Sequence, residues 1–564
     1  MLSLQQLILS IINKKIGMKN NLFGIVMIGV VVGLSVSCSG NKGKVEQENL
    51  EMKQKVEEFA MVELTTDLSH FSKKERKMIA IFIDIAEIMN DLFWQQSFGD
   101  KSILDTISDE WTKKFAVINY GPWERLNDLK PFVGGYGEKP LGSRFYPADM
   151  TKEEFEKWDD PNKTSLYTII VRDEKGQLKS VWYKDYYKNQ IDRVCELMEN
   201  AIKLAEDAGL KKYLELRLEA FKTDDYLESD MAWMDMKESL IDFIVGPIEN
   251  YEDKLFGYKA AYEAFILIKD VEWSNDLAKF TKMLPDLQKE LPCDPKYKQE
   301  VPGTESDLNV YDAIYYAGDC NSGSKTIAIN LPNDERVHLA KGARRLQLKN
   351  AMRAKFDKIL VPIGELILEQ EQHKNLKFEA FFWNVTFHEV AHGLGIKNTV
   401  NGKGNVRQAL QAQYSGWEEA KADILGLFMV ETLIEKGEIT NITVEQAYTT
   451  FIAGILRSVR FGASSAHGQA NMMCYNFFEE KGAFTRNEEG KYHIDIEKAR
   501  QAMRDWAAFI LQVEGDGDLE TATSYKEKNG GISEKLQADL DKINSAGIPR
   551  DIDFIQGKEV LGLK

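Results

Sequence analysis

The sequence predicts a mainly α protein with a smaller β core, an α+β fold divided into two lobes. Its 564 residues are more than one hydrophobic core usually serves, so we expect two folding units. Apolar residues recur at helical spacing over most of the chain, and a few short segments favour strands. A hydrophobic content of 43% is enough for a packed interior.

Residues 1–40 have the pattern of an export signal. Residues 23–37 are apolar and uncharged, follow basic residues, and are too few to cross a bilayer comfortably. The small residues around Cys38 resemble a bacterial lipoprotein signal. We therefore expect a lipid anchor at Cys38, residues 41–49 as a tether, and a periplasmic or outer-membrane-associated protein. An ordinary cleaved signal peptide is the alternative, and both place the mature chain outside the cytoplasm.

Charge and cysteine spacing exclude some functions. The net charge is −17, and such a chain repels phosphate backbones, so we expect no nucleic-acid partner. Apart from Cys38, the cysteines are too widely spaced for a metal knuckle, and whether they form disulfides stays open. These four are Cys195, Cys293, Cys320 and Cys474.

Local patterns predict several elements. Residues 191–205 and 351–370 have apolar residues at helical spacing, and Pro362 predicts a kink or break in the second segment. Residues 166–183 contain two strand-like runs around a turn and predict a β-hairpin. Residues 326–331 predict a further strand, which Pro332 would end.

The most informative motif is HEVAH, which has the HExxH pattern of zinc peptidases. His388 and His392 are four residues apart, so on a helix both imidazoles share a face and can bind one metal ion. Glu389 would lie beside the open coordination position, where it can take a proton from water. Apolar residues at helical spacing over residues 378–385 support this helix. A helix with two hydrogen-bonded histidines is the alternative.

A third ligand is needed, because catalytic zinc usually has three protein ligands. Residues 416–427 predict a second helix with Glu419 and Asp423 four residues apart on one face. One carboxylate can bind the metal while the other holds a ligand histidine by its far nitrogen. A solvated acidic helix start is the alternative.

His467 lies among small residues at a predicted helix start, where it could approach a substrate closely. From the residues alone, a hydrogen-bonded core histidine is favoured.

With these segments the chain resembles the dipeptidyl peptidase III family, from about residue 212 to residue 484. The EEAKAD segment resembles the family's glutamate-pair motif, and AHGQA resembles its A-H-x-Q-A segment. HEVAH has one residue fewer than the family's HExxGH motif, and this shorter spacing fits a regular helix.

The resemblance implies a role for each site residue. One Zn²⁺ would be bound by His388, His392 and Glu419, with Glu389 as general base and His467 stabilising the transition state. The remaining implied roles are Glu418 and Asp423 behind the ligand histidines, and Asn330 and Asn333 at the substrate's N-terminal end. Asp242 stands where the family has a glutamate that binds the substrate's N-terminus.

The resemblance also implies two lobes around a wide cleft. By alignment, the lower lobe with the β core comprises residues 50–263 and 312–356. The upper, helical lobe with the metal comprises residues 264–311 and 357–564.

We therefore expect a monomeric zinc metallopeptidase that releases dipeptides from the N-termini of short peptides. A thermolysin-like zinc endopeptidase shares the HExxH motif and is one alternative. A peptide-binding lipoprotein with a non-catalytic metal site is another, although a structural site has no need of the base Glu389.

Overall fold

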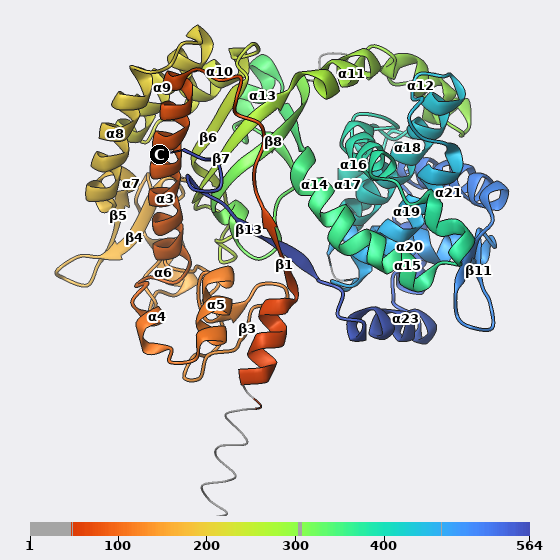
Figure 1. The fold of residues 1–564 in the computed structure, drawn as a ribbon, viewed down its shortest axis with the longest axis horizontal. Coiled ribbons are helices and arrows are strands. Elements are labelled where there is room, and N and C mark those ends of the chain that lie inside the picture. The colour runs from red at the N-terminus through yellow and green to blue at the C-terminus, as the bar shows by residue number, and fades with distance from the viewer. Residues whose placement is uncertain (1–46, 48, 303–306, 464, 564) are drawn as a thin grey trace, which may run out of the picture.

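The structure, a computed structural model, describes residues 47, 49–302, 307–463 and 465–563. The chain forms two lobes side by side, one around a β-sheet and one almost entirely helical (Figure 1). This confirms the predicted fold class. The predicted export signal, the lipid site at Cys38 and most of the tether lie outside the described residues. Within the described part, no helix combines the length and apolar character that a membrane span requires.

A five-stranded sheet forms the centre of the first lobe, in the order β6-β7-β8-β10-β9. Neighbouring strands are antiparallel except β8 and β10, which are parallel. The three longest strands are buried along most of their length. The strands are β6 (Ile241–Glu249), β7 (Ala261–Asp270), β8 (Asp307–Gly318), β9 (Ala328–Leu331) and β10 (Arg344–Leu348).

Helices cover this sheet, and the longest of them is α3 (Lys73–Ser97), which packs on β7 and β8. α3 begins at Ser72, whose side chain forms a capping box with Glu75. The predicted hairpin is confirmed, as β4 (Thr168–Arg172) paired with β5 (Leu178–Trp182). The other main helices of this lobe are α5 (Glu110–Asn119), α8 (Lys188–Ile202), α9 (Ala208–Thr223), α10 (Leu227–Asp235) and α13 (Glu335–Lys341).

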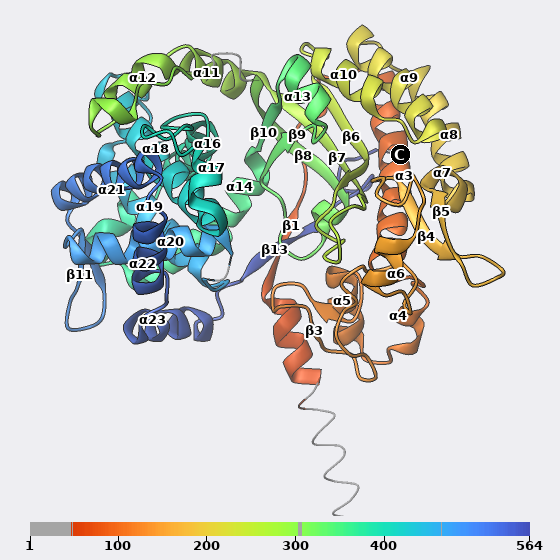
Figure 2. The ribbon, with the colours of Figure 1, turned by 180° about the vertical axis from the view of Figure 1, so that it is seen from behind.

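The helical lobe is arranged around α18 (Tyr414–Glu435), which packs against the helices around it and is buried along most of its length. The surrounding helices are α16 (Phe378–Ala391), α19 (Val444–Val459), α20 (Ala466–Glu480) and α21 (Ile496–Asp516), as Figure 2 shows from behind. The outer elements are α11 (Val271–Thr281), α12 (Leu284–Glu290), α17 (Val406–Leu410), α22 (Leu519–Asn529), α23 (Glu534–Ser545), β11 (Phe484–Arg486) and β12 (Tyr492–Ile494).

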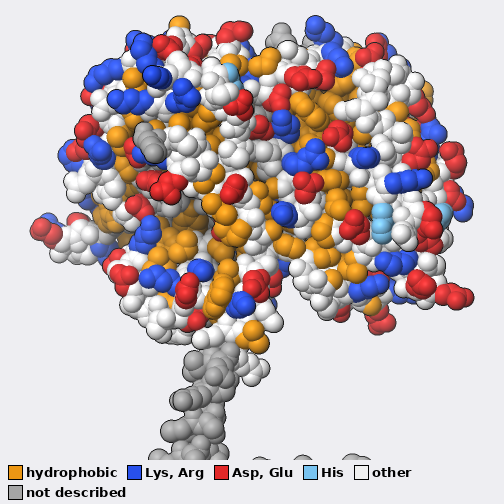
Figure 3. Space-filling view, viewed as in Figure 1, with side chains coloured by type: hydrophobic (Ala, Val, Ile, Leu, Met, Phe, Trp, Pro, Cys, Tyr) orange, Lys and Arg blue, Asp and Glu red, His pale blue; other side chains and the backbone are white. Residues whose placement is uncertain are grey.

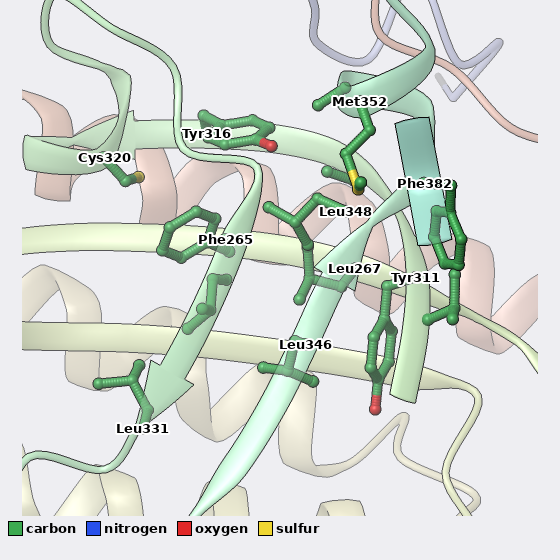
Figure 4. Packing of buried hydrophobic residues seen from close by; sticks show 14 of the residues in the cluster. Phe265, Leu267, Tyr311, Tyr316, Cys320, Leu331, Leu346, Leu348, Met352 and Phe382 are labelled. Atoms are coloured by element: carbon green, nitrogen blue, oxygen red, sulfur yellow. The ribbon is translucent and has the colours of Figure 1, made fainter. Parts of the chain in front are cut away.

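A continuous helical segment joins the two lobes after β10. α14 (Lys349–Lys355) passes through a π-helical turn, Phe356–Leu360, into α15 (Val361–Ile367). Pro362 follows this π turn directly, so the wider turn accommodates the missing N–H and the helix continues rather than breaking. Side chains from the sheet, α14 and α16 belong to one buried cluster, as Figure 4 shows for Leu348, Met352 and Phe382.

The structure corrects the expected lobe boundaries. The boundaries at residues 263/264 and 311/312 fall inside β7 and β8, which pair with each other as far as Asp270 and Val310. The boundaries therefore belong at the strand ends, because a hydrogen-bonded strand cannot be divided between two lobes. Between these strands, α11 packs on β8, and its Trp273 also contacts Phe382 of α16, so α11 lies between the lobes. α12 follows it on the helical lobe (Figure 1).

The end of the chain is a second correction, because it returns to the sheet lobe instead of staying with the helices. β13 (Asp551–Ile555) pairs in parallel with β1 (Phe59–Glu63). The side chain of Gln556 then binds the backbone of Tyr316 in β8, donating to its carbonyl at 2.8 Å and accepting from its N–H at 2.9 Å.

Candidate metal centre

The HEVAH segment forms the end of α16, as predicted, and ends in the helix cap at His392. His388 and His392 lie on the same face, and their ring centroids are 4.9 Å apart. Aromatic residues of α16 are buried in the lobe core and fix the helix there. Beyond this cap, the chain turns at Gly395, whose φ of +83° favours glycine.

α18 lies directly against α16 and carries the carboxylates. Asp423 Oδ1 lies 2.7 Å from His388 Nδ1, and Glu418 Oε1 lies 2.8 Å from His392 Nδ1. A carboxylate accepts, so each imidazole donates from Nδ1, and in its neutral form it has a lone pair on Nε2 for a metal ion. Both histidines are thereby oriented with Nε2 facing the space between the two helices.

Glu419 supplies the third donor atom in this space. Its Oε2 lies 3.3 Å from His388 Nε2 and 3.8 Å from His392 Nε2. This oxygen is buried and accepts no hydrogen bond of ordinary geometry within the described part of the chain. Two imidazole nitrogens and a carboxylate oxygen are a donor set that zinc prefers, and a buried carboxylate oxygen surrounded by imidazole nitrogens fits a cation there.

His467 also reaches this space. Ser465 caps α20, so His467 lies in the first turn of that helix, and its Nδ1 is 3.0 Å from Glu419 Oε2. By proximity alone, His388, Glu419 and His467 form a possible ligand group. We favour His392 as the ligand, because Glu418 orients its ring whereas the His467 side chain is 62% exposed. The ligand set and the role of His467 stay predictions.

Electrostatic interactions at this site favour a positive charge. Burial lowers the pKa of His388, but Asp423 and Glu419 raise it by more, so the net pKa lies well above its usual value. Burial raises the pKa of Glu418, but His392 and Lys421 lower it to about 2. The pKa of Glu419 is lowered because His388 and His467 outweigh its burial. These carboxylates therefore stay ionised at neutral pH, ready to bind a cation.

Glu389 faces a cleft of about 750 Å³ that also contains the donor atoms of the metal centre. The opposite wall of this cleft comes from the sheet lobe and includes Tyr251, Asn330 and Arg345. Arg345 lies close enough to Glu389 for their charges to interact. The cleft thus combines the candidate metal centre, the Glu389 carboxylate and polar groups from the other lobe.

The predicted pair Asn330 and Asn333 lies at the edge of the sheet, in β9 and just after it. The predicted strand 326–331 is confirmed in shorter form, as Ala328–Leu331. Asn330 faces the metal cleft, whereas Asn333 lines an adjoining cavity of about 520 Å³. Tyr251 lines both, so the two spaces meet beside it.

Asp242 does not reach either cavity. Its side chain is 1% exposed and pairs with Arg344 at 3.2 Å, while Trp233 Nε1 donates to it at 2.8 Å. The expected position for binding a substrate's N-terminus is therefore used for internal packing in this chain.

Sequence reasoning missed several residues that support the metal centre. Lys421 Nζ donates to Glu418 Oε2 at 2.8 Å, and Tyr414 Oη donates to the same oxygen at 3.1 Å. Asn471 Nδ2 lies 3.4 Å from Asp423 Oδ2. The first two pairs are three and four residues apart on α18, a helical spacing that could have indicated them, whereas Asn471 and Asp423 are 48 positions apart and follow no spacing rule.

Gly426 permits the close contact between α16 and α18. A Cβ at this position would lie 2.8 Å from the backbone nitrogen of His388. Glycine is therefore required for the two helices to approach this closely. A lone glycine inside a predicted helix was the available signal.

The four described cysteines are free. The prediction that left their pairing open is resolved in favour of free thiols.

Comparison with known proteins identifies the family. The sequence model of Peptidase family M49 matches residues 160–413, which include the HEVAH segment. The structure of DPP III from Caldithrix abyssi is similar over 90% of this chain and 99% of that chain, with 39% identity and a TM-score of 0.86. The dipeptidyl-peptidase III of Corallococcus sp. strain EGB is similar over 90% and 97%, with 35% identity and a TM-score of 0.76.

A curated relative from Arabidopsis thaliana, named Nudix hydrolase 3, is 32% identical over 578 residues. The match covers 90% of this chain and 74% of that protein. The similar solved structures, the family match and the HExxH and EExxAD motifs of this chain all indicate the same family. The chain belongs to Peptidase family M49, the dipeptidyl peptidase III family.

Proposed function

We propose that this protein is a zinc-dependent metallopeptidase that releases dipeptides from the N-termini of short peptides. The observation that carries this proposal is the convergence of His388 Nε2, His392 Nε2 and Glu419 Oε2 beside Glu389. The solved relatives named as DPP III or dipeptidyl-peptidase III support the exopeptidase activity.

His388, His392 and Glu419 would hold the zinc ion, and Asp423 and Glu418 hold the two imidazoles in place. When bound, zinc would polarise the scissile carbonyl and make water a better nucleophile. Glu389 takes the proton from the attacking water and later passes it to the leaving amine. His467, at the same cleft, donates a hydrogen bond to the oxyanion that develops.

The sheet lobe positions the substrate. Asn330 faces the metal cleft and Asn333 faces the adjoining cavity, so the two amides can bind successive polar groups of an extended peptide. We infer that the peptide's N-terminal end lies on this side. The distance between the bound N-terminal end of the peptide and the metal centre would then decide which peptide bond is cleaved, and so the length of the released fragment.

The variant Glu389→Gln tests the proposal. It removes the base while keeping the shape, so kcat should fall by about 10²–10⁴-fold or more while one zinc ion per chain is retained. The assay is the mass of products from a free-amine pentapeptide, together with metal content. Glu379→Gln, at the start of the same helix, is the matched control and should retain full activity.

The same peptide with an acetylated N-terminus separates the competing activities. A dipeptidyl peptidase releases a dipeptide from the free peptide and leaves the acetylated one intact. Internal cleavage of the acetylated peptide would instead favour the thermolysin-like alternative. Full turnover by Glu389→Gln would refute its role as base.

A further inference from the structure

A second cavity adjoins the metal cleft. It has a volume of about 550 Å³ and shares His388, Glu389 and His467 with the metal cleft. Asn330 and Tyr251 do not line it. Ala328 of β9 does line it, so the second cavity and the cavity beside Asn333 lie toward opposite ends of β9, with Asn330 and the metal cleft between them.

Three basic side chains line this cavity, and two of them have acidic partners. Lys325 Nζ lies 3.1 Å from Asp553 Oδ1, and Lys355 Nζ lies 2.9 Å from Asp551 Oδ1. Both carboxylates belong to β13, the strand that returns from the end of the chain. These ion pairs leave no charge free for a ligand.

Arg457 is the third basic group, and it has no such partner. Within residues 49–302, 307–463 and 465–563, no carboxylate lies within 4 Å of its guanidinium and no hydrogen bond to it is formed. Its Nε is completely enclosed. Burial lowers the pKa of Arg457. The negative charge of Asp551 raises this pKa, although Asp551 forms no ion pair with Arg457. An arginine remains protonated under these conditions, so its guanidinium carries a positive charge that no carboxylate contacts directly, and Glu389 and Asp423 line other parts of the cavity.

This arrangement differs from that of neighbouring arginines. Arg460, three residues further along, donates to the carbonyls of Pro549 at 2.7 Å and Ile548 at 2.8 Å. On the face seen in Figure 3, basic side chains are interspersed with acidic ones on both lobes. An enclosed charge without a partner is costly, and a bound anion would offset that cost.

The guanidinium is also positioned for recognition. Its central carbon lies 5.7 Å from the ring centroid of Phe381, a residue of α16 that lines the same cavity. Contact with an aromatic face restricts the plane of the guanidinium, which can then bind a carboxylate with two parallel hydrogen bonds.

We propose that Arg457 binds a carboxylate on the leaving-group side of the peptide substrate. This inference rests on the proposed dipeptidyl peptidase function. Asn330 and Asn333 hold the N-terminal end, so the residues after the scissile bond extend past Glu389 and His467 toward Arg457. The carboxylate is either the C-terminus of a short peptide or the side chain of an aspartate or glutamate near the scissile bond.

Three tetrapeptides of the same backbone length test this inference. The first has a free C-terminus, the second a C-terminal amide, and the third a C-terminal amide with glutamate as its last residue. Each kcat/KM is divided by that of a dipeptidyl arylamide, which has no carboxylate. The wild-type protein should favour the free acid over the amide by about 10–100-fold, as expected for a hydrogen-bonded charge pair.

In Arg457→Gln this ratio should fall to about 1, and in Arg457→Lys it should be intermediate, because lysine keeps the charge but loses the planar fork. Arg353→Gln is the matched control, since Arg353 lies outside the cavity and is 49% exposed, and it should keep the wild-type ratio. Restored activity on the third peptide assigns the subsite to acidic side chains as well as to C-termini.

A wild-type ratio near 1, or the same ratio in the wild type and Arg457→Gln, would overturn the inference. If Arg457→Gln does not fold, the Arg457→Lys ratio decides, and an unchanged ratio there counts against the guanidinium fork. If the wild-type protein releases no dipeptide from any peptide, the proposed function fails separately. Calorimetric affinity of the Glu389→Gln protein for the free and amidated peptides then tests Arg457 without catalysis.

Discussion

The metal centre and the opposite wall of the cleft differ in how their residues are held. In the proposed metal centre, the Nδ1 of each histidine on α16 is hydrogen-bonded to a carboxylate of α18. These two bonds hold the two helices together. Tyr251, Asn330 and Arg345 of the wall come from separate segments of the sheet lobe. The hydrogen bonds of the centre therefore fix its geometry within the helical lobe alone. The position of the wall relative to the metal centre depends instead on how the two lobes are placed.

The largest effects are expected at the centre, from the histidines. His392→Ala should lose bound zinc. Its zinc affinity should fall by more than the roughly 100-fold expected when a residue that only supports a ligand is removed. His467→Ala should keep one zinc per chain and lower kcat by about 10²–10³-fold, as for loss of an oxyanion donor. Metal content after dialysis, measured beside kcat, distinguishes the two. Zinc loss from His467→Ala but not from His392→Ala would reverse their assigned roles.

A smaller effect is expected from the spacing of α16 and α18. Gly426→Ala inserts a methyl group against the His388 backbone, so the free energy of unfolding should fall by about 1–3 kcal/mol and zinc affinity should weaken. Gly454→Ala is the control, because its Cβ would meet nothing closer than 4.0 Å, from Leu360, and alanine favours a helix. Denaturant unfolding and zinc titration of both variants measure the difference. Equal stability would mean that the contact is not tight.

The smallest effect is expected at the wall. Asn330→Ala or Asn333→Ala should raise KM by about tenfold, the loss of one hydrogen bond, while zinc content is unchanged. Asn200→Ala, on the exposed surface of α8, is the control. Steady-state kinetics on one tetrapeptide measures KM and kcat. A loss of zinc in the wall variants would contradict the separation between the two regions.

The metal helices could be predicted because their information is local. His388 and His392 at a four-residue spacing define one helix face, and Glu419 and Asp423 define another. For Glu418 and for His467, in the first turn of α20, the role came from the family resemblance, because the residue pattern alone favoured a core histidine at His467. The structure places all of these side chains near one another.

Most of the sheet could not be predicted from local patterns. β6, β7 and β8 are buried on both faces, so they lack the alternation of apolar and polar residues that indicates a strand. The pairing of Asp242 with Arg344 and the isolation of Arg457 depend on segments far apart in the chain. No spacing in the sequence encodes such long-range partners.

The strand that returns from the helical lobe has a consequence for biosynthesis. β1 has β13 as its sole partner strand within the described chain, and the paired residues are 492 positions apart. At about 5–20 residues per second, roughly 25–100 s of translation separate the two strands. During that interval the backbone groups of β1 stay unpaired, so the nascent chain carries an open β edge until its last segment emerges.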